Sequence, residues 1–521
     1  MLKRLSQSIR EFRLPSVLSP VFVSMEVVME VLIPMMMGWL IDKADTSYVI
    51  RTGILLIVLC MFSLWFGVLA GNYASRASAG FAKNLRHDMY HNVQGFSFSN
   101  IDKFSSSSLV TRLTTDVTHL QNSYQMLIRI AVRSPIMTIM SLVMAFRINA
   151  KLASVFLCVI PFLAAGLFTI TKKAHPVFKR MFKKYDRLNT VVSENLRGIR
   201  VVKSFVREDT EEKKFKNVSG EIYNDSKIAE GYLAFNAPIM QFSSYTCMIA
   251  IAWLGARMII STNASALSTG DLFSVITYTM QILMNLMTIS MLYVMLTMSK
   301  ASAERICEVL SEESNLKSPE NAVVDVEDGS IEFSGVGFSY SNSKEHLCLS
   351  DVNLKIESGE TVGIIGSTGS SKTSFVQLIP RLYDVTEGTV KVGGRDVREY
   401  DLDTLRNSVA MVLQKNVLFS GTIKDNLRWG NENATDEEMI EACRLSCADD
   451  FISEMPEGYD TFIEQGGTNV SGGQKQRICI ARSLLKKPKV LIMDDSTSAV
   501  DTKTDAMIRK AMKEYIPETT K

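Results

Sequence analysis

The feature that most constrains this chain is a series of long apolar segments confined to residues 1–305. An α-helix needs about 20 apolar residues to cross the hydrocarbon core of a bilayer. The segments 53–70 and 152–171 contain no charged residue at all. The sequence predicts six such spans, at about 15–41, 53–73, 127–146, 152–171, 234–260 and 272–299. Six spans exclude a soluble enzyme and predict a transmembrane domain over residues 1–305.

Two long polar segments, 76–126 and 172–232, separate the spans into pairs. The second segment carries many lysines and arginines, which mark the cytoplasmic side of a membrane. An even number of spans then places both chain ends in the cytoplasm. Residues 189–212 have a helical pattern, so we expect the membrane helices to continue far into the cytoplasm. Residues 1–14 are amphipathic, and we expect an interfacial helix there.

The composition changes after residue 305. A polar, acidic linker is predicted over residues 306–330, and an α/β domain over residues 331–521. Residues 331–338 alternate as a strand does, and residues 361–365 are typical of a short buried strand. A net charge of +2 gives no indication of a nucleic-acid partner.

A glycine-rich loop follows the second predicted strand and leads into a helix predicted from Lys372 to about Leu382. Such a loop holds phosphates with its backbone N–H groups and with the N-terminus of the helix. Lys372 would reach the β- and γ-phosphates, and Thr373 would bind Mg²⁺. Ser371 stands where the motif has a glycine, so its Cβ would meet the phosphate or strain the loop. The candidate loop comprises Gly366, Ser367, Thr368, Gly369, Ser370, Ser371, Lys372 and Thr373.

Two further motifs follow in the same domain. The apolar strand predicted over 489–495 ends in two carboxylates. Asp494 would hold the Mg²⁺ shell, and Asp495 stands where a general base would orient water. Ser471, Gly472, Gly473 and Gln474 open a helix predicted to run to about Leu485, which makes a second phosphate-binding helix start. One domain does not need two such cradles, so we expect the second to serve a nucleotide held by another chain.

The order of these motifs, together with Gln414 and the segment 498–501, resembles the nucleotide-binding domain of ATP-binding cassette (ABC) transporters. The six-span domain ahead of it resembles the ABC exporter type. The resemblance implies a multi-domain half-transporter that binds ATP and Mg²⁺ and works as a head-to-tail dimer. Tyr340 would then stack on adenine, Ser471–Gln474 would be the signature motif, and Ser498–Asp501 the D-loop.

The same resemblance assigns further roles. Gln414 would lie at the γ-phosphate and complete the metal residues Thr373, Gln414 and Asp494. Asp495 occupies the position of the catalytic glutamate, one methylene shorter. Coupling helices near 97–112 and 195–208 would dock on the nucleotide-binding domains. The chain stops at Lys521, before the position of the switch histidine, so we expect the domain to be incomplete at its C-terminus.

The departures at Ser371 and Asp495 favour a degenerate ATP site and a heterodimer with a second half-transporter, with a homodimer as the alternative. The expected role is export of a drug, lipid or peptide across the bacterial cytoplasmic membrane. Two alternatives remain open: a catalytically inactive ATP-binding subunit that supports a partner, and a non-functional truncated fragment.

A methionine stripe on the last span allows two interpretations. Methionines at 280, 284, 287, 291, 295 and 298 share one helical face. They would form either an adaptable wall for apolar substrates or a face that packs against helices or lipid.

Overall fold

The computed structural model describes residues 1–43, 45–341, 343–496 and 499–521. The chain divides into two compact units. Unit 1 comprises residues 1–91 and 110–311, and unit 2 comprises residues 92–109 and 312–521. Residues 92–109, which lie between two membrane helices in the sequence, therefore belong to the unit that contains the nucleotide-binding motifs.

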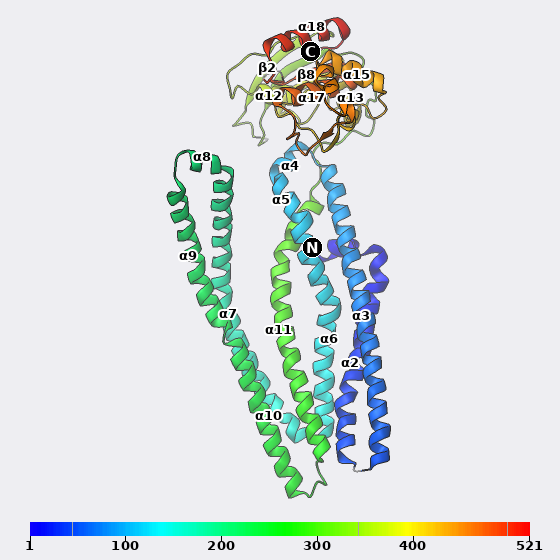
Figure 1. Ribbon diagram of the computed structural model, residues 1–521, viewed down its shortest axis with the longest axis vertical. Helices are drawn as coiled ribbons and strands as arrows, with labels where there is room; N and C mark the ends of the chain where they lie inside the picture. The colour runs from blue at the N-terminus through cyan, green and yellow to red at the C-terminus, as the bar shows by residue number, and fades with distance from the viewer. Residues whose placement is uncertain (44, 342, 497–498) are drawn as a thin grey trace. The chain divides into compact units, whose positions relative to one another are not determined.

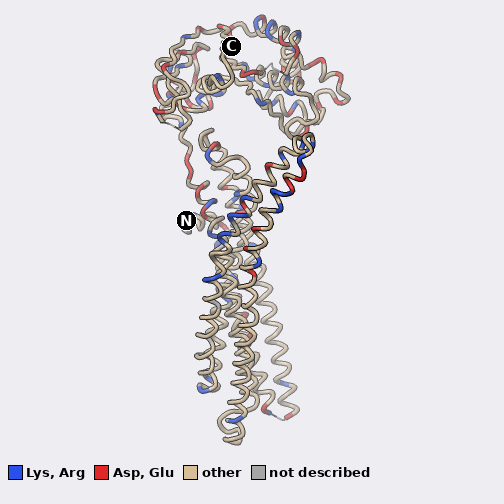
Figure 2. Tube along the Cα trace, turned by 90° about the vertical axis from the view of Figure 1, so that its left-hand side faces the viewer, with Lys and Arg blue, Asp and Glu red and all other residues tan. Residues whose placement is uncertain are grey.

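Unit 1 is helical, and six of its helices are long and apolar enough to cross a membrane, as the sequence predicted. Its elements are α1 (Leu2–Gln7), η1 (Arg10–Phe12), α2 (Arg13–Asp42), α3 (Thr46–Gln94), the π-helical turn η2 (Arg112–Asp116), α6 (Val117–Ile148), α7 (Ala150–Arg197), α8 (Ile199–Ser204), α9 (Glu208–Leu233), α10 (Asn236–Ser261) and α11 (Thr269–Ser311). Charged residues are sparse along the apolar stretches and frequent on the extensions beyond them (Figure 2).

The core of unit 1 lies where α2, α6, α10 and α11 meet. Val27, Met137, Ile251 and Tyr278 are buried there. The Tyr278 hydroxyl donates a hydrogen bond to the carbonyl oxygen of Val31 at 2.6 Å, which satisfies the one polar atom of a buried ring. Helices α7 and α9 run side by side away from this core and carry α8 at their tip (Figure 1).

The predicted interfacial helix over residues 1–14 is divided: α1 and η1 form two short helical pieces, and residues 13–14 already belong to α2. Arg10 adopts a positive φ of 40°, which separates α1 from η1. Leu5 is buried, and the hydroxyl of Ser8 donates to Asp88 on α3. Arg10 also pairs with Asp88, at 2.6 Å. The apolar face that the sequence assigned to lipid is therefore partly covered by protein.

Unit 2 contains an antiparallel sheet and a smaller parallel pair. The antiparallel sheet has the order β2-β1-β3-β4, and β5 pairs with β8 in parallel. The strands are β1 (Ile331–Phe338), β2 (Leu349–Ile356), β3 (Glu387–Val392), β4 (Arg395–Asp396), β5 (Val409–Val412), β6 (Gly421–Thr422), β7 (Phe462–Ile463) and β8 (Val490–Met493). The predicted strand over residues 331–338 is confirmed with the same bounds.

Most helices of unit 2 lie around these strands, and α4 and α5 come from the segment that follows α3. They are α4 (Phe98–Phe104), α5 (Ser106–Thr111, which continues into unit 1), α12 (Lys372–Gln377), α13 (Leu402–Ser408), α14 (Ile423–Arg428), α15 (Asp436–Leu445), α16 (Asp449–Ser453), η3 (Gly458–Asp460), α17 (Gly472–Leu485) and α18 (Thr502–Tyr515). Residues 323–516 of unit 2 contribute to two apolar cores, one beneath the antiparallel sheet and one around α15 and α17.

Two predictions about the phosphate loop's flanks are wrong. Residues 361–365 are not a buried strand, and Ile365 is 99% exposed. The Val362 N–H donates to the carbonyl oxygen of Lys521. Among the described residues, 363–365 form no hydrogen bonds with a neighbouring strand. The helix after the loop ends at Gln377 instead of Leu382. Pro380 explains this, because a proline and its predecessor disfavour a continuing helix.

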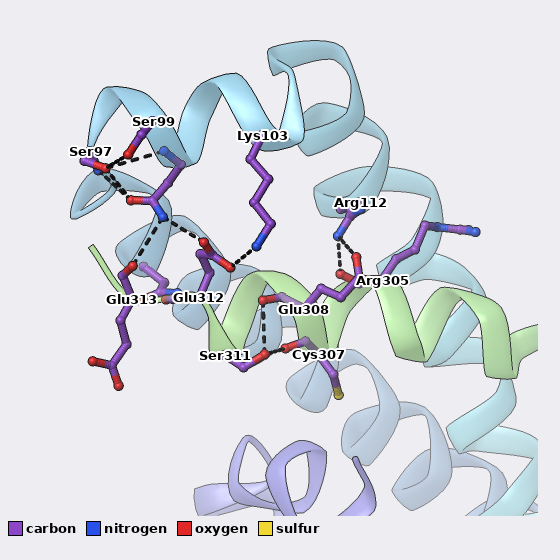
Figure 3. A network of polar contacts seen from close by, with 12 residues as sticks. Ser97, Ser99, Lys103, Arg112, Arg305, Cys307, Glu308, Ser311, Glu312 and Glu313 are labelled. Carbon is purple, nitrogen blue, oxygen red and sulfur yellow. Dashed lines mark hydrogen bonds and ion pairs between the residues drawn. The ribbon is translucent and has the colours of Figure 1, made fainter. Parts of the chain in front are cut away.

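Polar contacts fix α4 within unit 2 (Figure 3). Ser97 and Asn100 form a capping box at its N-terminus. The Asn100 side-chain amide donates to Glu312 at 2.8 Å, and Lys103 pairs with the same carboxylate at 2.7 Å. Within unit 1, Arg112 similarly pairs with Glu308 at 2.9 Å. Asn100 and Lys103 thereby tie α4 to Glu312, the first residue after α11, and Arg112 is tied to α11 itself.

Candidate nucleotide-binding site

The loop from Gly366 to Ser370 is exposed and leads directly into α12. Gly369 has a φ of +85°, and Ser371 is left-handed with φ 59° and ψ 25°. Only glycine adopts such angles without steric cost. The backbone at position 371 therefore retains the conformation that a glycine would favour, and the strain expected for Ser371 is present in the backbone itself.

Lys372 lies folded over this loop. Its Nζ donates to the carbonyl oxygens of Gly366 at 2.7 Å and Ser367 at 2.9 Å. These bonds hold the ammonium group above the loop, where a phosphate would meet it. Lysine acts at such sites as a compact positive charge with three donors.

Thr373 and Asp494 meet at the edge of the parallel strand pair. Thr373 Oγ1 donates to Asp494 Oδ2 at 2.8 Å. Asp494 directly follows β8, and its N–H donates to the carbonyl oxygen of Val412, the last residue of β5. A hydroxyl beside a carboxylate is the hard-oxygen donor set that Mg²⁺ prefers. These two residues therefore fit the metal that the sequence led us to expect.

Gln414 and Asp495 come together at the same strand edge. The carboxyl ends of β5 and β8 lie side by side, since Val412 pairs with Met493. Gln414 Nε2 donates to Asp495 Oδ2 at 3.4 Å. Asp495 is left-handed, with a φ of 50°. Aspartate and asparagine tolerate this conformation better than longer side chains do, so the backbone gives a reason for aspartate at this position.

Tyr340 follows β1 and presents an exposed ring beside α12. Its hydroxyl lies 2.8 Å from the Ser374 hydroxyl, one residue beyond Thr373. The ring is 54% exposed and packs edge-on against Tyr383, with the centroids 5.2 Å apart. An exposed aromatic face next to a phosphate loop suits stacking on a base.

The signature residues form the N-terminus of α17. The Ser471 side chain accepts from the Gln474 N–H, and the Gln474 side chain accepts from the Ser471 N–H, which completes a capping box. A Cβ on Gly473 would lie 2.8 Å from the carbonyl oxygen of Ala499, so this contact requires glycine. Among the described contacts, none joins Ser471–Gln474 to the loop at 366–373.

The structure thus brings most predicted residues into three local groups: Lys372 with its loop, Thr373 with Asp494, and Gln414 with Asp495. Gln476 was missed, although it lies in the motif that identified Gln474. Its amide donates to the Asp495 carbonyl oxygen and accepts from the Ala499 N–H. Ser498, the first predicted D-loop residue, lies outside the described residues.

Tyr383 was also missed. Its hydroxyl bonds to Asp102 on α4, and its ring packs against both Phe98 and Tyr340. No local pattern marks it, because its partner Asp102 lies 281 residues earlier in the chain.

Comparison with known families agrees with this arrangement. Residues 17–287 match the ABC transporter transmembrane region, and residues 349–498 match the ABC transporter domain. The chain belongs to the ABC transporter family. This ABC transporter chain therefore joins a multi-pass membrane domain to an ATP-binding ATPase domain, in the manner of exporter-type half-transporters.

Relatives of this ABC transporter cover most of its length. YfiB of Bacillus subtilis, an uncharacterized ABC transporter ATP-binding protein, is 35% identical over 94% of this chain and 85% of its own. An uncharacterized ABC transporter ATP-binding protein of Mycobacterium tuberculosis is 34% identical over 92% of this chain and 82% of its own. The ATP-dependent lipid A-core flippase of Desulfotalea psychrophila is 30% identical over 87% and 79%.

Proposed function

We propose that this chain is one half of an ATP-driven exporter of a small apolar or amphipathic substrate. The substrate class covers drugs, lipids and peptides, and the membrane is the bacterial cytoplasmic membrane. The nucleotide-binding domain and both chain ends face the cytoplasm, which agrees with the basic residues on the extensions of α7 and α9.

The observation that carries this proposal is the position of α4. This helix follows a membrane span, yet it packs in the unit that holds the nucleotide-binding motifs. Asp102 of α4 accepts a hydrogen bond from Tyr383, and Tyr383 contacts the candidate adenine residue Tyr340. A conformational change around the nucleotide therefore has a direct mechanical route to a membrane helix.

Two features favour a dimer. The signature helix makes no described contact with the chain's own phosphate loop, which agrees with service to a partner's nucleotide. Helix α8 and the turn that joins it to α9 also expose large apolar side chains: Val201 is 60% exposed, Phe205 71% and Val206 79%. Apolar groups gathered on a solvent-exposed tip are typical of an interaction site, and the nucleotide-binding domain of a second chain is the proposed partner.

Asp495 and Ser371 favour a heterodimer. A carboxylate retracted by one methylene orients the attacking water poorly, and misplacement of about 1 Å can cost on the order of 10²-fold in rate. The signature motif, by contrast, is intact. This chain therefore supplies a good signature to its partner and keeps a weak site of its own, where Gln414, Asp494 and Thr373 hold Mg²⁺ and ATP with slow turnover.

The test requires a partner half-transporter that copurifies with this chain. The two chains are co-expressed, and the ATPase activity of the purified heterodimer is measured. Ser471→Ala removes the capping hydroxyl and should reduce activity severely, because it damages the partner's site. Asp495→Asn should reduce it much less. The reverse ranking, or full activity of this chain alone, would contradict the heterodimer.

The second candidate function is a subunit that binds ATP without hydrolysing it. The left-handed conformations of Ser371 and Asp495 favour it, because both lie in the chain's own site. Single-turnover hydrolysis by this chain's site separates the two candidates. Slow release of phosphate supports a weak enzyme, and bound ATP that remains intact supports a purely regulatory subunit.

The exposed methionines agree with an adaptable wall that accepts varied apolar substrates. Met280, Met284, Met287 and Met291 are 38–67% exposed, so they do not pack inside the chain, whereas Met295 is partly buried. The side chain of Met298 lies outside the described residues. Polarizable thioethers suit varied apolar ligands. The lipid A-core flippase among the relatives makes a lipid one reasonable member of this class.

A further inference from the structure

Four charged side chains lie inside predicted membrane spans of unit 1. Glu26 and Glu30 are on α2, and Arg129 and Arg133 are on α6. A charge within the bilayer is costly and usually marks a functional pathway when it is retained. The nucleotide-driven cycle described above uses none of these four residues.

One acidic residue in this group is incompletely satisfied. Arg133 Nη2 contacts both oxygens of Glu30, at 2.6 and 2.8 Å. The Arg133 guanidinium approaches Glu26 only at 3.6 Å, from Nε to Oε1. Glu26 is only 8% exposed, and its Oε2 has no hydrogen-bond partner. A buried carboxylate oxygen without a donor is costly unless a ligand or another donor supplies one.

Arg129 complements this oxygen. Its charge acts on the Glu26 carboxyl, yet among the described residues the Arg129 guanidinium forms no ion pair or hydrogen bond. Helix α3 lies against both groups. A Cβ at Gly67 would lie 3.3 Å from Glu26 Cδ, and one at Gly71 would lie 3.5 Å from Arg129 Nη1. The two glycines are four residues apart on one face, about 6 Å along the helix.

We propose that Glu26 and Arg129 bind the two charges of a zwitterionic headgroup. The ammonium donates to Glu26 Oε2, and the anionic group accepts from the Arg129 guanidinium. Two glutamates and two arginines already sum to zero charge. A lone cation or anion would leave an uncompensated charge inside the membrane, whereas a zwitterion leaves the group neutral.

This inference deepens the proposed function, since it rests on export of an amphipathic substrate and names a zwitterionic amphiphile as that substrate. The headgroup chemistry has two sources, a phospholipid or a water-soluble zwitterion. The spacing of Gly67 and Gly71 favours charges separated by a short linker, as in phosphoethanolamine.

Lipid binding to the full chain in detergent tests the site without nucleotide. The probes are short-chain phosphatidylethanolamine, phosphatidylglycerol of the same chain length, and free glycerophosphoethanolamine, a water-soluble phosphodiester zwitterion, titrated by native mass spectrometry. We expect Glu26→Gln and Arg129→Gln each to weaken binding of the ethanolamine lipid about 10-fold or more. Arg147→Gln is the matched control, because Arg147 is an exposed arginine at the other end of α6. It should leave binding unchanged.

The outcomes separate the sources. Binding of the ethanolamine lipid alone indicates a lipid headgroup, and equal binding of free glycerophosphoethanolamine indicates a soluble zwitterion. Equal binding of phosphatidylglycerol, or unchanged affinity in both variants, would overturn the proposal. A melting curve of each variant shows whether it folds, and Arg129→Gln decides alone if Glu26→Gln does not. Because lipid binding is measured without ATP, a negative result would contradict the headgroup site and leave the ATPase test of the proposed function unaffected.

Discussion

The Tyr383 hydroxyl donates a hydrogen bond to Asp102 Oδ2 at 2.8 Å. Burial, and then this bond, raises the pKa of Tyr383, so the phenol stays protonated and acts as the donor. The same ring contacts Phe98 on α4 and Tyr340 beside the phosphate loop. One side chain therefore touches both α4, which follows the membrane helix α3, and the candidate adenine residue Tyr340.

Replacing this tyrosine by phenylalanine should loosen α4. Tyr383→Phe keeps the ring contacts but removes one hydrogen bond, which is worth about 1 kcal/mol. We expect faster hydrogen exchange over residues 98–104, with nucleotide affinity unchanged. Tyr515→Phe is the control, because Tyr515 is 63% exposed and lies on α18. Equal exchange in wild type and Tyr383→Phe would argue that the ring contacts alone hold α4.

Glycine at position 371 should improve nucleotide binding. Ser371→Gly relieves a left-handed residue, a strain of roughly 1–2 kcal/mol, and removes a Cβ from the loop expected to hold the phosphates. Affinity for a fluorescent ATP analogue should rise several-fold, and the melting temperature should not fall. Asp351→Gly is the matched control, since Asp351 has a φ of 49° on β2, away from the loop. An unchanged affinity would mean that the loop already accommodates the Cβ.

Asp494→Asn should remove the metal dependence of binding. The carboxylate that accepts from Thr373 would lose its charge, and an amide is a weaker ligand for Mg²⁺. The ratio of ATP affinities with and without Mg²⁺ should fall towards one. Lys372→Ala should instead reduce affinity in both conditions. A retained Mg²⁺ effect in Asp494→Asn would place the metal elsewhere.

Asp495→Glu should speed hydrolysis at this chain's own site. The longer side chain advances the carboxylate toward the water, and we expect a rate increase of about 10- to 100-fold. The gain has a cost in stability, because glutamate is less tolerant of a φ of 50° than aspartate. Phosphate release and a melting curve measure the two effects. A lower melting temperature without faster hydrolysis would leave backbone conformation as the reason for aspartate.

The attachment of α4 should weaken in acid. A hydrogen bond from Lys103, followed by one from Asn100, lowers the pKa of Glu312 below its usual 4.5. This contribution to stability is therefore present above about pH 4.5 and is lost as the pH falls through the lowered pKa. Exchange over residues 98–104, corrected for intrinsic rates, should rise in wild type in that range. Glu312→Gln should show weak protection at every pH, and an identical pH response would refute the assignment.

Local patterns in the sequence predicted much of this molecule. The six membrane helices and the strand β1 follow from apolar length and alternation. The helix α17 follows from Ser471 and Gln474, whose side chains cap it without help from the rest of the chain. In each case the determining interactions lie within a few residues of one another.

One error arose where distant residues decide, and another where a local signal was overlooked. Residues 361–365 have an apolar strand pattern, but a strand needs a partner, and within the described parts of the chain only Val362 finds one, at Lys521. The end of α12 could have been read from Pro380. The contact between Tyr383 and Asp102 could not, since tertiary packing alone joins residues 281 positions apart.

That separation also orders events during synthesis. Residues 92–109 leave the ribosome well before residues 312–521, with which they form one unit. At 5–20 residues per second, Asp102 waits roughly 15–60 seconds for Tyr383 to be made. During that time the helical structure of α4 is stabilised by its own capping box, without the contacts that Tyr383 later makes with Asp102 and Phe98. The nucleotide-binding domain is therefore assembled around a segment that was left in place by the growing membrane domain.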